Sequence, residues 1–273
     1  MRQSTAAAAI LVWLGTASTA GAAEFKNEIG MTFRLLPAGT FTMGSPSDEP
    51  SRDQDETEHQ VTISRPFYMQ TTEVTQGQWQ EIMGSNPSHH ADCGPDCPVE
   101  TVSWFEVQEF IETLNRRTGH NYRLPTEAEF EYAARAGSTT AFANGPITQT
   151  SCDFDPALDA IGWYCYNAGD SVQPVARKQP NAWGLYDMHG NLWEWCADSW
   201  DGSPYAPEPV VDPLSPSPSA DNNRVIRSGG WATEAWFVRS ANRDWCKPHY
   251  RNDFLGFRLV LPAVDPGQAA RKE

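Results

Sequence analysis

Residues 181–195 read Asn-Ala-Trp-Gly-Leu-Tyr-Asp-Met-His-Gly-Asn-Leu-Trp-Glu-Trp and form the most informative segment of the chain. The segment holds three of the 11 tryptophans and two of the 20 glycines, and it places acidic residues at positions 187 and 194. Large aromatic side chains are mostly buried in folded proteins, whereas glycine lets the backbone turn sharply. Together with 21 prolines in 273 residues, this composition predicts a core that is interrupted by many turns.

Three helix starts are marked by capping boxes, in which a hydroxyl residue is followed three positions later by Glu or Gln. The pairs are Thr75 with Gln78, Ser103 with Glu106, and Thr126 with Glu129. In each pair the two side chains satisfy backbone N–H groups that the first helical turn leaves without partners. The second helix is predicted to end near Gly119 and the third at Gly137. The second also carries an apolar stripe of Val107, Phe110, Ile111 and Leu114.

The remaining segments are typical of short strands joined by loops. The candidate strands are 33–36, 41–43, 61–63, 224–227 and 257–260. No internal repeat or linker divides the chain, and its length suffices for one large core. The sequence therefore predicts a single compact α+β domain over residues 24–273, rich in loops and with few short helices.

The first 23 residues have the pattern of a secretory signal peptide. A positive charge at Arg2 precedes an apolar run from Ala6 to Leu14, and small residues follow as far as Ala23. The run is too short to span a bilayer, and a lipoprotein signal would require a cysteine after it. We expect cleavage after residue 22 or 23, a periplasmic or secreted location, and no transmembrane segment in the mature chain.

The chain is strongly acidic, with a formal net charge of −15. Loss of Arg2 with the signal peptide makes it −16, which is −15 minus the +1 of that arginine. Such a charge repels phosphate backbones and argues against a nucleic-acid partner. It suits calcium, which prefers oxygen ligands, although solubility alone also explains many of the acidic residues.

Six cysteines in an exported chain predict disulfides. Cys93 and Cys97 close a short loop, and Cys152 and Cys165 flank another. Pairing the two that remain joins Cys196 to Cys246, although six cysteines allow 15 connectivities. Metal binding is the alternative, but no histidine stands at zinc-finger spacing from the first pair. None of the six histidines has zincin or facial-triad spacing, and the 89–90 pair is interpreted as a solvated loop.

Several segments together resemble the formylglycine-generating-enzyme, or sulfatase-modifying-factor, family. They follow the family's order and cover nearly all of the mature chain. Besides 181–195 they are 37–45 (PAGTFTMGS), 66–68 (PFY), 72–75 (TEVT), 98–104 (PVETVSW), 122–133 (YRLPTEAEFEYA), 228–230 (SGG) and 255–258 (LGFR). The resemblance implies the family fold, a compact α+β domain related to C-type lectins.

The resemblance also implies a departure from the family's best-known reaction. Its sulfatase-activating members hold copper with two cysteines after the Gly-Gly pair and oxidise a substrate cysteine to formylglycine. Counted from Gly230, those positions are Glu234 and Arg239 here, or Val238 for the second if the loop is one residue shorter. Soft sulfur is what binds Cu(I). We therefore expect no copper and no formylglycine generation by the copper mechanism.

A calcium site is implied at residues 187–194. Asp187 and Glu194 would offer side-chain oxygens, and Gly190 and Leu192 would offer backbone carbonyls. Aspartate replaces the family's asparagine at the first position, which keeps an oxygen and adds a charge. The alternative is that the two acids cap backbone N–H groups.

The altered loop supplies the candidate catalytic pocket. Its residues are Trp231, Glu234, Trp236, Arg239 and Arg243. An acid beside cations and aromatic walls could perform acid–base work, although the same residues could form a structural ion-pair network.

Two functional hypotheses follow from the resemblance. Some exported relatives without the cysteine pair mature secreted metabolites, including siderophore chromophore oxidation in pyoverdine pathways. The first hypothesis is therefore an oxidoreductase that matures a secreted peptide or metabolite. The second hypothesis is a non-catalytic, calcium-stabilised binding module. This fold presents variable loops on a rigid scaffold, and such loops could bind a peptide, metabolite or protein partner.

Overall fold

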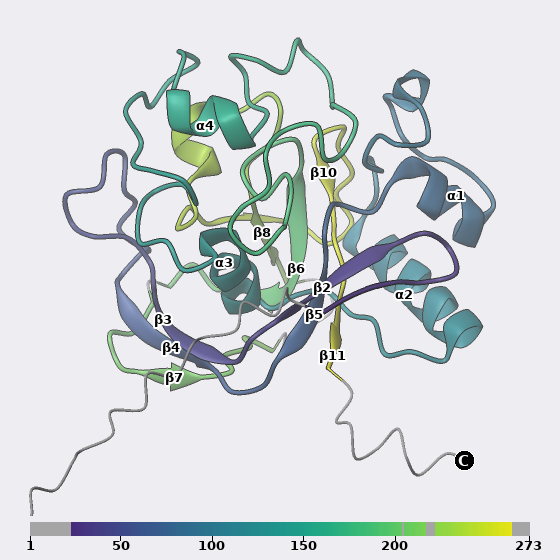
Figure 1. The fold of residues 1–273 in the computed structure, drawn as a ribbon, viewed down its shortest axis with the longest axis horizontal. Helices are drawn as coiled ribbons and strands as arrows, with labels where there is room; N and C mark the ends of the chain where they lie inside the picture. Colours follow the sequence, from purple (N-terminus) through teal and green to yellow (C-terminus); the bar gives the residue numbers. More distant parts are fainter. Residues whose placement is uncertain (1–22, 204, 217–221, 264–273) are drawn as a thin grey trace, which may run out of the picture.

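The computed structural model describes residues 23–203, 205–216 and 222–263, and residues 1–22 of the predicted signal peptide lie outside these ranges. Three small sheets and four α-helices build the described part (Figure 1). The helices are α1 (Gln76–Met83), α2 (Trp104–Thr118), α3 (Glu127–Arg135) and α4 (Pro156–Ile161), with 3₁₀ turns η1 (Ala91–Cys93) and η2 (Ala235–Val238). This is the single compact α+β domain that the sequence predicts. No helix in the described ranges is both long enough and apolar enough to cross a membrane.

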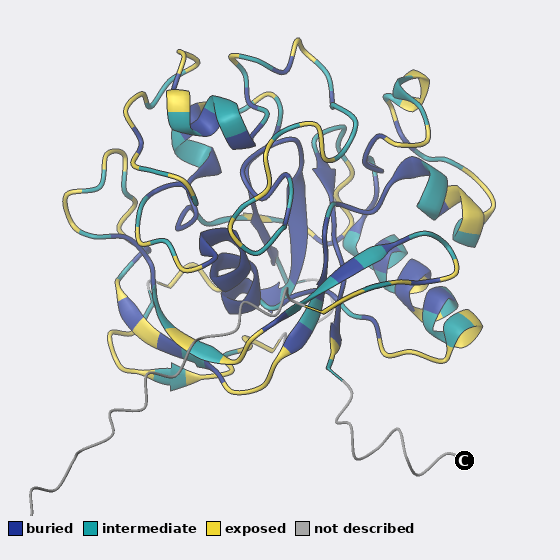
Figure 2. Cartoon of the chain, viewed as in Figure 1, coloured by how far each residue is buried: buried dark blue, intermediate teal, exposed yellow. Residues whose placement is uncertain are grey.

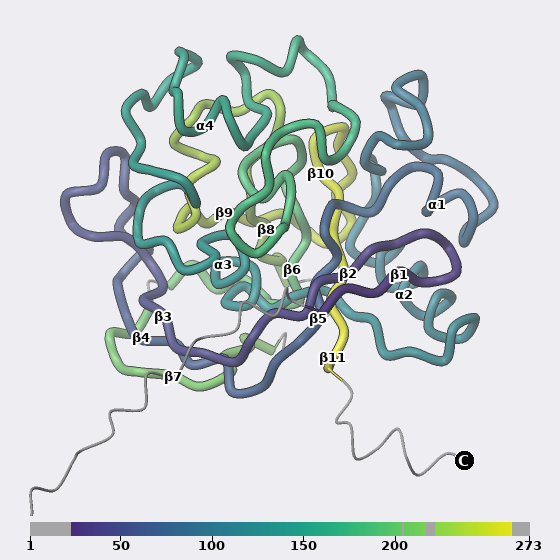
Figure 3. The backbone as a smooth tube through the Cα atoms, in the orientation of Figure 1, coloured from purple at the N-terminus to yellow at the C-terminus, as the bar shows by residue number. Residues whose placement is uncertain are grey.

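The first sheet joins the two ends of the domain. Its order is β1 (Glu24–Lys26), β2 (Thr32–Leu36), β5 (Phe67–Gln70) and β11 (Val260–Pro262), all antiparallel. Figure 3 shows the N-terminal strands in purple beside the yellow C-terminal strand. This pairing closes the domain, because the last strand to be synthesised completes a sheet that the first strands begin.

The second sheet contains the end of the 181–195 segment. Its order is β10 (Leu255–Gly256), β6 (Trp193–Ser199), β8 (Arg224–Arg227) and β9 (Asp244–Cys246). Trp195 is completely buried on β6, and its indole N–H donates to the carbonyl of Val102 at 3.0 Å. The third sheet is β3 (Gly39–Met43), β4 (His59–Ile63) and β7 (Val210–Val211).

The predicted helix starts are confirmed. Each of α1, α2 and α3 begins with its capping box, and α2 buries its predicted stripe and ends at Gly119. The α3 helix ends one residue earlier than predicted, because Ala136 adopts the left-handed conformation with φ 46°. Trp79 of α1 stacks on Phe110 of α2 with ring centroids 5.1 Å apart, a favourable separation for an aromatic pair.

Four of the predicted strands are confirmed, and the fifth is wrong in its extent. The segment 257–260 is not one strand, because the chain passes from one sheet to another within it. Leu255 and Gly256 pair with β6, whereas Val260 pairs with Met69 of β5. The intervening Arg258 is completely buried and ion-paired.

Two of the three predicted disulfides are present, Cys93–Cys97 and Cys152–Cys165. The third is wrong, because Cys196 and Cys246 are free thiols. Strand β8 lies between their strands, and two strand spacings are about 10 Å, beyond the reach of a disulfide. The two side chains also pack into different hydrophobic clusters. Burial raises the pKa of Cys246 to about 12 and that of Cys196 well above its ordinary value, so neither is a thiolate.

Helix α3 lies at the centre of the molecule, and all nine of its residues are buried (Figure 2). Three of these residues are glutamates, so their charges must be compensated locally. Arg227 of β8 binds Glu131 at 2.6 Å, and Arg135 binds the same carboxylate at 2.8 Å. Helix α3 thereby holds a row of buried charged side chains. The first of them, Glu127, lies at the candidate functional site.

Candidate functional site

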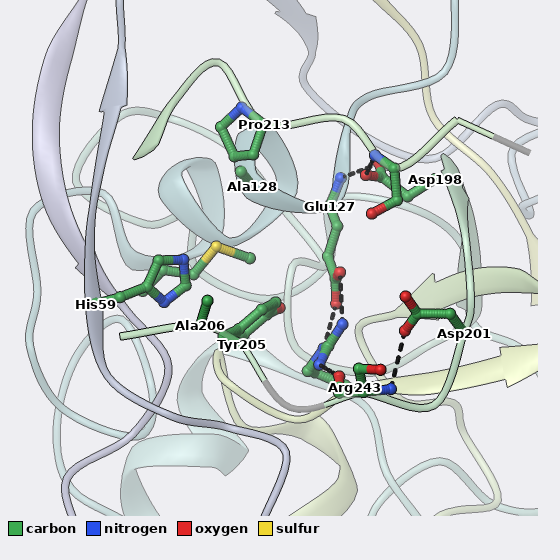
Figure 4. Close-up of a pocket in the computed structure, with 12 residues that line it drawn as sticks. His59, Glu127, Ala128, Asp198, Asp201, Tyr205, Ala206, Pro213 and Arg243 are labelled. Atoms are coloured by element: carbon green, nitrogen blue, oxygen red, sulfur yellow. Dashed lines mark hydrogen bonds and ion pairs between the residues drawn. The ribbon is translucent and has the colours of Figure 1, made fainter. Parts of the chain in front are cut away.

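A cavity of about 200 Å³ opens between the N-terminus of α3, the end of β6 and the loop that follows β6 (Figure 4). Most of its wall is polar. It is lined by Met43, His59, Glu127, Ala128, Asp198, Asp201, Ser203, Tyr205, Ala206, Pro213, Ser215 and Arg243. Sites for whole small molecules occupy about 300–1,000 Å³. This cavity therefore suits a single side chain or one small ring.

Asp198 lies on the wall of the cavity near the end of β6. One carboxylate oxygen accepts the backbone N–H of Glu127 at 2.7 Å, and the other accepts that of Ser215 at 2.8 Å. Burial, and then the negative charge of Glu127, raise the pKa of Asp198 to about 7, while the two N–H donors oppose this shift. Near neutral pH the group is therefore present in both protonation states. That is the condition for efficient proton transfer.

Glu127, the first residue of α3, is paired with Arg243. The guanidinium donates to both carboxylate oxygens, at 2.8 and 3.0 Å. Burial alone would raise the pKa of Glu127, but the charges of Arg243 and Arg227 hold it below its ordinary value. The cavity thus has one carboxylate fixed as an anion beside another that titrates near neutrality, an arrangement that separates two acid–base roles.

Aromatic rings form the wall beside this ion pair. The Arg243 guanidinium stacks on Tyr205 at 3.8 Å from the ring centroid and on Trp200 at 4.7 Å. His59 lies 4.7 Å from the Tyr205 ring. The Tyr205 hydroxyl is buried without a hydrogen bond of normal geometry. Burial, and then the charge of Glu127, raise its pKa well above the ordinary value. The Tyr205 hydroxyl therefore stays neutral and can donate a hydrogen bond to a bound polar group.

The five pocket residues predicted from the sequence do not meet in one cavity. Arg243 lines the cavity described above. Arg239 is completely buried elsewhere, bound to Glu49 and Glu56. Glu234 is exposed and accepts the indole N–H of Trp236 at 2.8 Å. Trp231 donates its indole N–H to the backbone carbonyl of Asp253. For Arg239 the structural alternative of an ion-pair network is the one observed.

The sequence interpretation missed Asp198, Glu127 and Tyr205. Asp198 stands three residues after the end of the 181–195 segment, and Glu127 lies inside a capping-box motif whose pattern indicates only helix initiation. Nothing local distinguishes either from a solvent-facing acid. Their importance comes from the burial that the tertiary fold imposes.

The residues implied as calcium ligands lie together in the core. Glu194 is completely buried and accepts hydrogen bonds from Arg258 on both oxygens, at 2.7 to 3.0 Å. The same guanidinium donates to the backbone carbonyl of Asp187 at 3.2 Å. The carbonyl of Gly190 accepts the hydroxyl of Ser228 at 3.2 Å. Glu194 is therefore compensated by an arginine within the protein itself.

Two other carboxylates in this region lack such compensation. Asp187 has one buried oxygen without a partner, and Glu73 has two. Burial, followed by the charges of Asp187 and Glu194, raises the pKa of Glu73 well above its ordinary value. Burial also raises the pKa of Asp187 to about 6. The charge of one guanidinium, Arg258, acts on all three buried carboxylates, and unpartnered carboxylate oxygens are the kind of ligand that a hard divalent cation prefers. Asp187 and Glu73 would hold it, with Glu194 already bound to Arg258.

Comparison with known proteins defines the class to which this fold and site belong. The model of the sulfatase-modifying factor enzyme 1-like domain matches residues 20–263. The chain belongs to this family.

Individual relatives agree with that assignment. The solved structure of PvdO from Pseudomonas aeruginosa is 31% identical, with a TM-score of 0.78, and the match covers 89% of this chain and 99% of that one. The chaperone protein LppX of Paenibacillus barcinonensis is 29% identical over 63% of this chain and 71% of its own length. The formylglycine-generating enzyme of Streptomyces coelicolor is 32% identical over 64% of this chain. That match spans 56% of the Streptomyces enzyme.

Proposed function

We propose that this protein is an exported oxidoreductase that matures a secreted peptide or metabolite without the copper–cysteine chemistry of formylglycine generation. Membership of the family and the likeness to PvdO support an oxidoreductase-like role. The observation that carries the proposal is the polar cavity in which Asp198 titrates near pH 7 beside the fixed anion Glu127.

The site supports proton transfer during an oxidation. Removing two electrons from an O–H, N–H or C–H group also releases protons, and Asp198 is the side chain best suited to accept one. Arg243 would orient an anionic or aromatic group against its guanidinium and the Tyr205 ring. Molecular oxygen is the proposed oxidant: it would take up the two electrons and two protons that the substrate loses and leave as hydrogen peroxide.

The absence of cysteine from residues 229–245 supports a reaction that does not use copper–cysteine chemistry. Glu234 and Arg239 stand at the positions implied for copper ligands, and neither is a ligand for soft Cu(I). The two free thiols cannot replace them, because both are protonated and pack into different hydrophobic clusters.

The proposal predicts a change in the host's secreted products. A strain that lacks the gene should accumulate a precursor carrying two more hydrogen atoms than the normal product, and the gene supplied in trans should restore the product. Mass spectrometry of the culture medium measures both species. Identical secreted profiles in the two strains would count against a maturation role.

A binding module remains the second candidate, and one specific observation favours it. Glu127 and Arg243 neutralise each other at the cavity, so the site could hold a ligand unchanged. The likeness to a protein described as a chaperone supports the same role. The two candidates differ in outcome, because a module returns its ligand chemically intact.

For either candidate we propose that calcium stabilises the fold through Asp187 and Glu73. A cation at a hundred times its dissociation constant adds about 2.7 kcal/mol, which corresponds to about 5–10 °C in Tm for a domain of this size. Chelation should therefore lower Tm by about that amount, and Asp187→Ala should abolish the response. Asp48→Asn, a change at an exposed acid, is the matched control.

The pH dependence of this effect follows from the raised pKa of Asp187. Without the cation, the folded protein holds a proton that the unfolded chain releases between pH 3.8 and about 6, so stability falls as the pH rises through that window. Calcium replaces the proton at higher pH. Chelation should thus lower Tm more at about pH 7 than at about pH 5. An unchanged melting curve at both values would rule out the site.

A further inference from the structure

Three potential metal ligands converge although they come from distant parts of the chain. His89 and His90 precede η1, and Asp253 precedes β10. One ligand atom from each lies within 4.8 Å of the other two. His90 Nε2 is 3.7 Å from Asp253 Oδ2, too far for a good hydrogen bond. Two ligands of a tetrahedral ion are about 3.4 Å apart when each metal bond is about 2.1 Å, so the spacing suits a shared ion.

His90 is held firmly and has one nitrogen left over. Its backbone N–H donates to Glu100 at 2.8 Å, and its carbonyl accepts from Gln76 at 3.1 Å. Ring Nδ1 lies 3.2 Å from the hydroxyl of Ser171, which fixes the orientation of the imidazole. Nε2 is buried and has no hydrogen-bond partner. Buried polar atoms are rarely left unpaired, and a metal ion at Nε2 would satisfy this one.

The surrounding structure also supports the loop after His90 and the backbone of Asp253. The Cys93–Cys97 disulfide restrains the loop directly after His90. Trp231 packs edge-on against the His90 ring at 5.6 Å, and its indole N–H donates to the carbonyl of Asp253 at 3.1 Å. A single tryptophan thus contacts both halves of the cluster. Such support from outside the ligand set is what gives a metal site defined geometry.

We propose that His89, His90 and Asp253 bind a divalent transition-metal ion, such as zinc or iron(II). Imidazole nitrogens suit these ions, whereas calcium prefers an all-oxygen set. Three protein ligands would leave at least one coordination position open for a small oxygen-donor ligand, and the exposed His89 makes the cluster accessible from solvent. None of the three residues lines the 200 Å³ cavity, so this site stands independently of the proposed oxidation.

The test is metal titration of the full mature chain, prepared without a histidine tag and with calcium present. Zn²⁺ is followed by calorimetry and Co²⁺ by its visible absorption. We expect one equivalent of either ion to bind saturably. His90→Ala and Asp253→Asn should each weaken binding at least tenfold, because the first removes a ligand and the second replaces an anionic ligand with a weaker neutral amide. His120→Ala, a change at an exposed histidine that packs against Tyr122, should bind like the wild type.

Two further variants keep the test independent of misfolding. His89→Ala changes an exposed side chain, so its Tm should match the wild type while its affinity falls at least tenfold. Ser171→Ala removes a group that orients the imidazole, and a smaller loss of affinity is expected. Failure of the wild type to bind one equivalent of Zn²⁺ or Co²⁺ would overturn the proposal. Undiminished binding by His89→Ala, His90→Ala and Asp253→Asn would overturn it equally.

Discussion

Replacing Arg239 with methionine is expected to destabilise the protein by about 3–5 kcal/mol, because one partner of a buried ion-pair cluster is removed. The guanidinium is completely buried and donates to Glu56 twice, at 2.7 and 2.8 Å, and to Glu49 at 2.7 Å. It also donates to the carbonyls of Ser51 and Trp236. Without it, two carboxylates and two carbonyls would lose their hydrogen bonds to the guanidinium, and Glu56 would keep only the hydroxyl of Ser45 among its side-chain donors. Four of these hydrogen bonds tie the loop before β4 to the end of η2.

Denaturant unfolding would measure this loss, and thermal unfolding should show a fall in Tm of about 6–20 °C. Arg116→Met, a change at a side chain that is 69% exposed, is the matched control and should alter stability by less than about 0.5 kcal/mol. If Arg239→Met were as stable as this control, the ion pairs would not hold the loop, and Arg239 would again be available as a functional group.

The contribution of Arg239 should also depend on pH. Burial opposes ionisation of Glu56, but the hydrogen bonds and charge of Arg239 bring its pKa below the ordinary value of 4.5. The folded state then favours the ionised form, so this stabilisation is present above pH 4.5 and is lost as the pH falls below it. Glu49 shifts the other way, because burial raises its pKa by more than its single contact with Arg239 lowers it.

Replacing Asp198 with asparagine is expected to lower the rate of the proposed oxidation by about 10²- to 10⁴-fold, the usual contribution of a general acid or base. The wild-type rate should change with pH around the pKa of about 7, and this inflection should be absent in the variant. Asp201→Asn is the matched control, since Asp201 lines the same cavity but is exposed. A normal rate in Asp198→Asn would exclude Asp198 from the reaction.

A stability measurement separates catalysis from misfolding. The pKa of Asp198 is raised from 3.8 to about 7, so the folded protein binds a proton that the unfolded chain lacks in that window. Its contribution to stability therefore falls as the pH rises from about 4 to about 7. The asparagine side chain of the variant cannot ionise and does not have this pH dependence. The unfolding free energy of Asp198→Asn should therefore rise relative to that of the wild type as the pH rises over the same range.

The parts of the fold that depend on neighbours in sequence were predictable. Thr75, Ser103 and Thr126 begin helices because each meets its partner side chain three residues later, and all three capping boxes form. Short-loop disulfides were predictable for the same reason. The Cys196–Cys246 pairing failed because strand β8 separates the two cysteines, and no local pattern shows the order of strands.

The site was less predictable, because its chemistry arises from burial and from contacts between distant residues. Arg243 was identified, but its partner Glu127 lies 116 residues away. His90 and Asp253 are separated by 163 positions, since 253 minus 90 is 163, and their spacing matches no motif. Glu73 lies inside the recognisable segment 72–75, yet only the fold shows that its carboxylate is buried without a partner.

The most direct test of the central claim is turnover without copper. The purified protein is given the precursor that accumulates in the deletion strain, with oxygen and a Cu(I)-selective chelator, and in parallel a Cys-Xaa-Pro-Xaa-Arg peptide with copper and reductant. We predict that the precursor loses two hydrogen atoms and that the peptide forms no aldehyde. Recovery of the precursor bound but unchanged, or aldehyde formation on the peptide, would contradict the account.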